Sequence, residues 1–203
     1  MTTITVSRQL GSLGVEIATE VAARLGYRLV RREVLNQAAR RAGAPEAALA
    51  DIDELGLLGM SPSPRASKAY HQAISQVMLE LVSEGNVVII GRAGQVILRD
   101  LPNILHVRVI APLALRVERL TARYGISPAA AAAQIEASDH YRRNYLKRFY
   151  HVRWEDPELY DLVVNTAQLD CASAAEIVVA AVPHQSGRPA SPPPQHEHTA
   201  SAI

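Results

Sequence analysis

The sequence has 203 residues, which is enough for one domain with a sizeable core. Hydrophobic residues make up 48% of it, charged residues make up 20%, and the formal net charge is +1. This balance gives the chain as a whole no attraction to nucleic acid or to an anionic membrane. One cysteine, Cys171, excludes an intramolecular disulfide. The first residues do not read as a signal peptide, and no apolar stretch reaches the ~18 residues of a membrane span. We therefore expect a cytoplasmic protein with no membrane partner.

Short β-branched or apolar runs alternate with helical patterns along the chain. Strands are expected at residues 3–7, 27–30, 87–90, 104–110 and 160–164. Helices are expected at residues 15–25, 32–42, 69–83, 112–124, 127–149 and 172–181. Strands that alternate with helices favour a mostly parallel sheet with helices on both faces. The sequence therefore predicts an α/β fold of three layers, α/β/α, with about five strands.

Two segments do not fit this alternation. Residues 44–66 are rich in proline and glycine and are expected to form a mobile loop or short helices. Residues 184–203 contain almost no apolar side chains, so we expect a disordered tail after a domain of residues 1–183. The histidines of this tail could bind a metal ion, although a solvated tail is the simpler interpretation.

A glycine-bearing turn joins the first strand to the first helix. Gly11 and Gly14 lie in this turn, where backbone N–H groups and a helix N-terminus can converge on an anion. The full P-loop pattern, G-x-x-x-x-G-K-[ST], is absent. On these residues alone, a tight turn without a ligand is an equally good interpretation.

The segment ITVSRQLGSLGVEIA resembles the first strand and loop of cytidylate kinases, which read like ITIDGPSGAGKGT. The match needs no gap from Ile4 to Leu25, and the SRQ-x-GSGG-x-x-IA pattern of the cytidylate kinase-like branch fits more closely. The resemblance implies a P-loop NTPase-type fold with a helical lid. It also implies that Gly11, Ser12 and Gly14 cradle the phosphates of ATP, with Mg²⁺ as cofactor.

The loop departs from the family pattern at its most charged position. Gly14 falls on the loop lysine and Val15 on the next position, so the lysine charge and the Ser/Thr ligand to Mg²⁺ are missing. We expect the missing charge to come from Arg8 or from arginines of the lid.

A second motif follows the third strand, where the chain reads VVIIGRAGQVILRDLP. It resembles the DGRD segment of cytidylate kinases, in which the arginine reaches the monophosphate acceptor. Gly91 and Arg92 are therefore expected to bind the acceptor, although a solvated charge or a structural ion pair is the alternative for Arg92. Ala93 replaces the family's aspartate. The family's D-[RK]-E segment becomes Arg31-Arg32-Glu33, which keeps Glu33 but inverts one charge.

A third motif is the basic helix near residues 125–150, which we expect to be the lid. The D-R-x-R motif of cytidylate kinases corresponds here to Asp139-x-x-Arg142-Arg143. Arg142 and Arg143 are expected to clamp the transferring phosphoryl group, with Asp139 and Lys147 also in the lid. A solvated basic face is the alternative on spacing alone. Basic residues with interleaved tyrosines also raise nucleic-acid binding, but no nucleic-acid motif accompanies them.

The last motif, W-x-DP-x-x-YDL-x-x-NT from Trp154 to Thr166, matches the same branch. Asn165 and Thr166 are as suited to capping a turn as to touching a ligand.

Together the four segments identify the chain as a member of the cytidylate kinase-like family over about residues 4–181. This resemblance implies a kinase that transfers the γ-phosphoryl group of Mg-ATP to CMP or dCMP, with small-molecule nucleotides as partners. Two alternatives stay open. One is a nucleotide-binding regulatory module with weak or no activity, and the other is a kinase for a different, more anionic acceptor. The sequence does not predict an oligomeric state.

Overall fold

The computed structural model describes residues 2–31, 36, 40 and 64–182. Within them, five strands form one sheet in the order β2-β3-β1-β4-β5, and every neighbouring pair is parallel. The strands are β1 (Thr3–Arg8), β2 (Arg28–Val30), β3 (Val87–Ile90), β4 (Ile104–Ile110) and β5 (Leu162–Asn165). The predicted α/β class and parallel sheet are confirmed.

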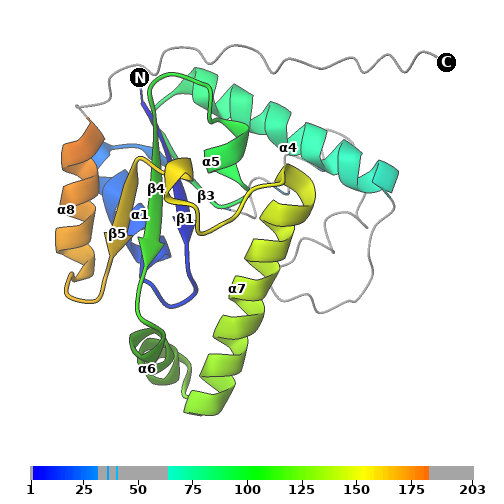
Figure 1. The fold of residues 1–203 in the computed structure, drawn as a ribbon. Coiled ribbons are helices and arrows are strands. Elements are labelled where there is room, and N and C mark those ends of the chain that lie inside the picture. The colour runs from blue at the N-terminus through cyan, green and yellow to red at the C-terminus, as the bar shows by residue number, and fades with distance from the viewer. Residues whose placement is uncertain (1, 32–35, 37–39, 41–63, 183–203) are drawn as a thin grey trace.

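Helices cover both faces of the sheet (Figure 1). One face carries α1 (Gly14–Leu25) and α8 (Cys171–Ala181), and the other carries α4 (Pro64–Glu84), α5 (Gly94–Ile97) and the C-terminal part of α7 (Pro128–Tyr150). Helix α6 (Leu113–Tyr124) packs against α7, and a short 3-10 helix, η1 (Pro157–Leu159), precedes β5. The sequence did not predict α5 or η1.

Some expectations lie outside the described residues. Of the predicted helix 32–42, residues 36 and 40 are helical and the others are not described. The predicted acceptor residue Glu33, most of the segment 44–66 and the tail 184–203 are also outside the described residues.

Strand β3 is buried on both faces, as the continuous apolar sequence of residues 87–90 predicts. In β3, Val88 and Ile90 pack toward α1 and α8, whereas Val87 and Ile89 pack toward α4 and α5. This alternation follows from the period of two residues in a strand. Among the described helices, none is both long and apolar enough to cross a lipid bilayer.

Parallel register brings the functional segments to one edge of the sheet. Val6 of β1 pairs with Ile90 of β3, and Arg8 pairs with Val109 of β4. The turn after β1 and the Gly91-Arg92 segment after β3 therefore leave the sheet side by side. Ligands of such sheets bind at this carboxyl edge.

The packing of α4 against α7 depends on an aromatic cluster around His71. The imidazole of His71 lies 4.3 Å from the ring of Phe149, and the hydroxyls of Tyr145 and Tyr150 lie 3.4 and 3.3 Å from its Nδ1. Burial, and secondarily the positive charge of Arg92, lower the pKa of His71 from 6.5 to about 4. The folded protein therefore keeps this imidazole neutral in mildly acidic solution.

We predict that this site makes stability depend on pH in a defined window. As the pH falls below 6.5, His71 binds a proton in the unfolded chain, whereas in the folded chain it binds that proton only near pH 4. The contribution of His71 is thus fully present above pH 6.5 and declines as pH falls toward 4. In urea unfolding at a series of pH values, the His71→Phe variant should lose less unfolding free energy across this window than the wild type. His140→Gln changes an exposed histidine of α7 and should follow the wild type; equal pH slopes for all three proteins would contradict the assignment.

Candidate functional site

The turn after β1, residues 9–13, is fastened to β4 by hydrogen bonds. The amide of Gln9 donates to the carbonyl of Val109 at 3.1 Å, and Gln9 Oε1 accepts from the amide of Ala111 at 3.0 Å. Ser12 is fully buried, and its hydroxyl donates to the carbonyls of Gln9 and Val109. The side chain of Ser12 therefore supports the turn, and its predicted contact with phosphate stays a prediction.

Two residues of this turn have left-handed backbone conformations just before α1. Gly11 and Leu13 have φ values of 80° and 65°, in the left-handed region, and Leu13 caps α1 without a side-chain hydrogen bond. The first backbone bond of the helix runs from Ile17 N–H to the carbonyl of Leu13. Amides of the first turn are thus not used within the helix, which is the arrangement that suits an anion.

A cavity of about 640 Å³ lies between this turn and helix α6. We call it the loop cavity. Its lining includes the turn with the start of α1 (residues 8–11 and 13–16) and four arginines, namely Arg8, Arg119, Arg123 and Arg142. Among its described lining residues there is one carboxylate, Glu16, and the guanidinium group of Arg123 donates to it. The cavity is therefore suited to a ligand with several negative charges.

Arg119 connects the turn to the segment after β5. Its guanidinium group donates to the carbonyl of Gly11 at 3.3 Å and to both Oγ1 and the carbonyl of Thr166 at 2.9 Å. Thr166 in turn donates to the carbonyl of Ser12 at 3.1 Å, and Asn165 Oδ1 accepts from the amide of Ala167. Of the two interpretations of Asn165 and Thr166, the described contacts are those of turn capping.

A second pocket lies at the carboxyl ends of β1 and β3, and we call it the Arg92 pocket. It is lined by Ser7, Arg8, Ile90, Gly91, Arg92, Ala93, Gln95, Tyr141, Arg142, Tyr145, Leu146 and Trp154. Arg92 has a φ of 55°, donates to Asn36 Oδ1 at 3.1 Å, and lies 5.9 Å from the ring of Tyr70. Arg92 is thus oriented by described neighbours, and no carboxylate is among the described residues of this lining.

Arg8 and Arg142 line both the loop cavity and the Arg92 pocket. The side chain of Arg8 crosses from one to the other: a Cβ added at Gly14 would overlap its Cβ and lie 2.9 Å from its Cγ, and a Cβ added at Gly91 would lie 3.1 Å from its Nη1. The stem of Arg8 therefore packs against the start of α1, and its guanidinium group reaches Gly91.

Arg142 is placed by buried neighbours on α6 and α7. Asp139 lies 3.8 Å from the guanidinium group of Arg142 and accepts a hydrogen bond from Arg116 at 2.8 Å. Asp139 and Arg116 are both 6% exposed. The guanidinium carbon of Arg142 also lies 5.8 Å from the centre of the Trp154 ring. Asp139 thus lies between two arginines and ties α7 to α6.

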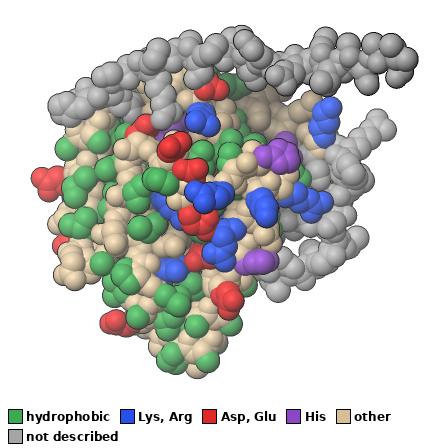
Figure 2. Space-filling model, viewed as in Figure 1, with side chains coloured by type: hydrophobic (Ala, Val, Ile, Leu, Met, Phe, Trp, Pro, Cys, Tyr) green, Lys and Arg blue, Asp and Glu red, His purple; other side chains and the backbone are tan. Residues whose placement is uncertain are grey.

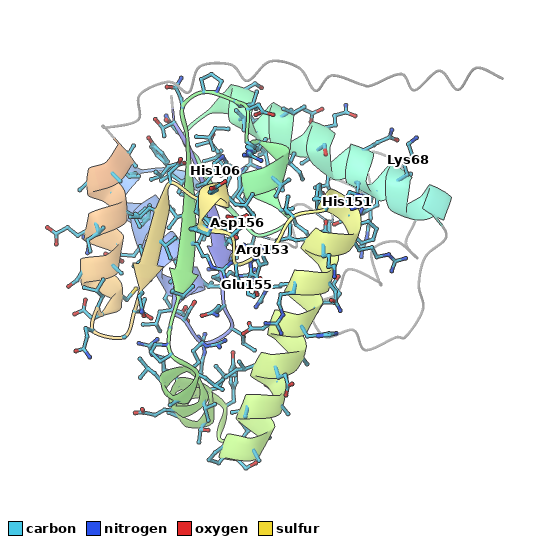
Figure 3. All side chains as sticks on the ribbon, viewed as in Figure 1. Lys68, His106, His151, Arg153, Glu155 and Asp156 are labelled. Carbon is cyan, nitrogen blue, oxygen red and sulfur yellow. The ribbon has the colours of Figure 1, made fainter. Side chains whose placement is uncertain are left out.

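The structure does not bring Arg143 and Lys147 to either pocket. The side chain of Arg143 is 46% exposed and lies 3.6 Å from Glu155, and Lys147 is also exposed. Glu155 belongs to the segment that follows α7 (Figure 3). On this face of the molecule, basic and acidic side chains are interleaved (Figure 2). Of the two predicted clamp arginines, Arg142 alone has the geometry for the site.

Trp154, for which the sequence predicts no role in a site, is part of the lining of the Arg92 pocket. Its Nε1 donates to Ser7 Oγ at 2.9 Å, and the buried guanidinium group of Arg108 lies 4.4 Å from its ring. Arg108 also donates to the hydroxyl of Tyr160 at 3.1 Å. In the sequence, an arginine within an apolar strand indicates a buried polar network. The sequence does not show that Trp154 is the partner of Arg108, because the two residues are far apart along the chain.

The donor set of the loop cavity does not fit a protein-held Mg²⁺ ion. Magnesium prefers oxygen ligands, usually one or two carboxylates together with phosphates. Val15 offers none, Glu16 is paired with Arg123, and Gln9 Oε1 already accepts from Ala111. In the described part of the chain, no group of three or more His, Cys, Asp and Glu side chains could hold a metal ion.

Comparison with known proteins gives a consistent set of likenesses. The model of the cytidylate kinase-like family matches residues 3–168. The cytidylate kinase of Ignicoccus hospitalis is 27% identical over 178 residues, which are 88% of this chain and 97% of that protein. The cytidylate kinase of Pyrococcus horikoshii is 31% identical over 111 residues, or 55% of this chain and 57% of that protein. A uronate isomerase of Corynebacterium glutamicum is 37% identical over 102 residues, which are 50% of this chain but 20% of that protein.

Solved structures share the fold at low identity. A protein from Eubacterium ventriosum has a TM-score of 0.73 and 19% identity, over 91% of this chain and 100% of that chain. A gluconokinase from Sinorhizobium meliloti has a TM-score of 0.54 and 16% identity, over 90% and 92% of the two chains. At these identities the likeness concerns the fold.

We predict that the contact between Arg8 and Gly14 makes any side chain at position 14 costly. Gly14→Ala should lower the free energy of unfolding by about 1–3 kcal/mol, because the added methyl group overlaps the Arg8 stem. Chemical denaturation of Gly14→Ala, Arg8→Gly and the double variant measures this contact as a double-mutant cycle. The alanine should cost less in the Arg8→Gly background, and additive effects would show that the overlap is not its cause.

Proposed function

This chain belongs to the cytidylate kinase-like family, and we propose that it is a phosphotransferase that moves the γ-phosphoryl group of ATP to a phosphorylated acceptor, with CMP and dCMP as first candidates. The observation that carries the proposal is that Arg8 and Arg142 line both the loop cavity and the Arg92 pocket. A donor in the cavity and an acceptor in the pocket would meet at these two guanidinium groups.

Phosphoryl transfer needs positioning and charge neutralisation more than covalent chemistry. The backbone from Gly11 to Gly14 would cradle the donor phosphates at the start of α1. Arg92, held by Asn36, would bind the acceptor phosphate, since a guanidinium group forms paired hydrogen bonds to phosphate oxygens. Arg142, placed by Asp139, would stabilise the transferring group.

The identity of the acceptor depends on positions where this chain differs from cytidylate kinases. Ala93 brings no carboxylate to the pocket. Arg31 donates to Thr19 Oγ1 at 3.2 Å and is exposed, so it gives no support to a more anionic acceptor. Uncharged groups of the pocket, such as Gln95 and Tyr141, would then contact the base or sugar.

The proposal is tested by ADP release from ATP in the presence of CMP, dCMP, UMP or AMP. We predict turnover with a cytidine nucleotide, and we predict that Arg92→Ala raises the KM for the acceptor about tenfold or more, because a charge-assisted phosphate contact is lost. Arg99→Ala removes an exposed arginine outside both pockets and is the matched control. ATP binding without turnover for any acceptor would favour a nucleotide-binding regulatory module instead.

A second prediction separates the arginines of α7. Arg142→Ala should lower kcat about a hundredfold or more and change the KM for the acceptor less, because its charge acts on the transferring group. Arg148→Ala, an exposed position of the same helix, should keep the wild-type kcat. Similar losses in both variants would indicate a general effect on α7 and would remove Arg142 from the proposed mechanism.

A further inference from the structure

The described lining of the loop cavity carries more positive than negative charge. It has four arginines and one glutamate, which gives a local charge of +3 (four minus one). The glutamate, Glu16, is already paired with Arg123. Arg119 donates to uncharged oxygens of Gly11 and Thr166, so its charge remains uncompensated by these contacts. Arg142 also lies 3.8 Å from Asp139, a carboxylate that it shares with Arg116.

Arg8 brings one of these charges to the position that a loop lysine would otherwise serve. The ungapped alignment of the first strand places Arg8 on a glycine of the family loop and Gly14 on its lysine. In space, the two positions touch, since any Cβ at Gly14 would overlap the Arg8 stem. Compared with the cytidylate kinase loop, the two residue types are therefore exchanged across one contact, and the cation enters from β1 and not from α1.

The described lining of the loop cavity offers few ligands for a metal ion. Val15 is apolar, and the oxygens of Glu16 and Gln9 accept hydrogen bonds from Arg123 and Ala111. A triphosphate without its metal ion is more negative than its magnesium complex by the charge of the ion. A cavity rich in arginine favours the more negative form, because a guanidinium group can donate paired hydrogen bonds to phosphate oxygens.

We propose that the loop cavity binds nucleoside triphosphate in its metal-free form, with the guanidinium groups of Arg8, Arg119 and Arg142 neutralising the phosphates in place of a protein-held magnesium ion. This inference rests on the proposed function, because it concerns the donor site of that reaction. It concerns binding alone, so that it is tested without turnover.

The test is isothermal titration calorimetry of the full chain with ATP, in EDTA and in excess Mg²⁺ at equal ionic strength. Equal ionic strength is needed because salt screens contacts between arginine and phosphate. We expect the Kd in EDTA to be equal to or lower than the Kd in Mg²⁺. Arg8→Ala should raise the Kd in EDTA at least tenfold, which is about 1.4 kcal/mol.

Two further variants serve as controls. Arg8→Gln keeps the stem that packs against Gly14 and removes the charge, so its weaker binding cannot be attributed to a disturbed loop. Arg99→Ala is the matched control outside both pockets and should bind as the wild type does. Circular dichroism checks that each variant is folded.

Each outcome decides a different question. Binding that is tighter in Mg²⁺ than in EDTA overturns this inference, and turnover in the ADP assay would still support the proposed function. Unchanged binding by both Arg8 variants also overturns it. If ATP binds in neither condition, the inference and the proposed donor site both fail.

Discussion

The packing of the Arg8 stem against Gly14 is the contact on which the arrangement of the site depends. Because Gly14 has no side chain, the last residue of β1 can lie directly against the first turn of α1. The guanidinium group of Arg8 then extends past the carboxyl edge of the sheet to Gly91. One side chain thereby forms a wall of two cavities and fixes how close together they lie.

The groups beside Arg8 are held in position by neighbouring elements. These groups are the turn after β1 and the side chain of Arg142. Backbone and amide groups fasten the turn to β4, and Arg119 joins it to Thr166 through uncharged oxygens. On the other side, Asp139 is shared between Arg116 and Arg142, so that one buried carboxylate stands behind two arginines. Such preorganised charge costs no reorganisation when an anion arrives, which is the general basis of electrostatic catalysis.

Much of the fold could be predicted from the sequence because its signals are local. The apolar run at 87–90 indicated a strand buried on both faces, and turn residues at 85 and 86 indicated its start. Position in a parallel sheet then implied that the residues after β1 and β3 would lie at one edge, as Arg8 and Arg92 do. Short elements such as α5 and η1 escaped prediction, since three or four residues carry too little periodicity.

The choice between Arg142 and Arg143 could have been made from helical spacing. Successive residues of a helix point about 100° apart, so two adjacent arginines face different directions. Arg142 precedes the buried Tyr145 and Leu146 by three and four residues and shares their face, whereas Arg143 shares the face of the exposed Lys147. The contact between Arg8 and Gly14 could not be predicted from helical spacing, because it joins the end of a strand to the start of a helix.

The exchange of residue types between Arg8 and Gly14 changes what the loop can recognise. A lysine is a compact charge on a flexible stem, and it commonly works beside a metal ion that binds the same phosphates. An arginine that lines the cavity from β1 offers a planar set of donors with fixed directions, and its stem is held by Gly14. With Val15 apolar and Glu16 paired, the proposed recognition of the donor would depend on directed hydrogen bonds more than on metal coordination. A site built in this way selects its ligand by the negative charge and the geometry of its phosphate oxygens.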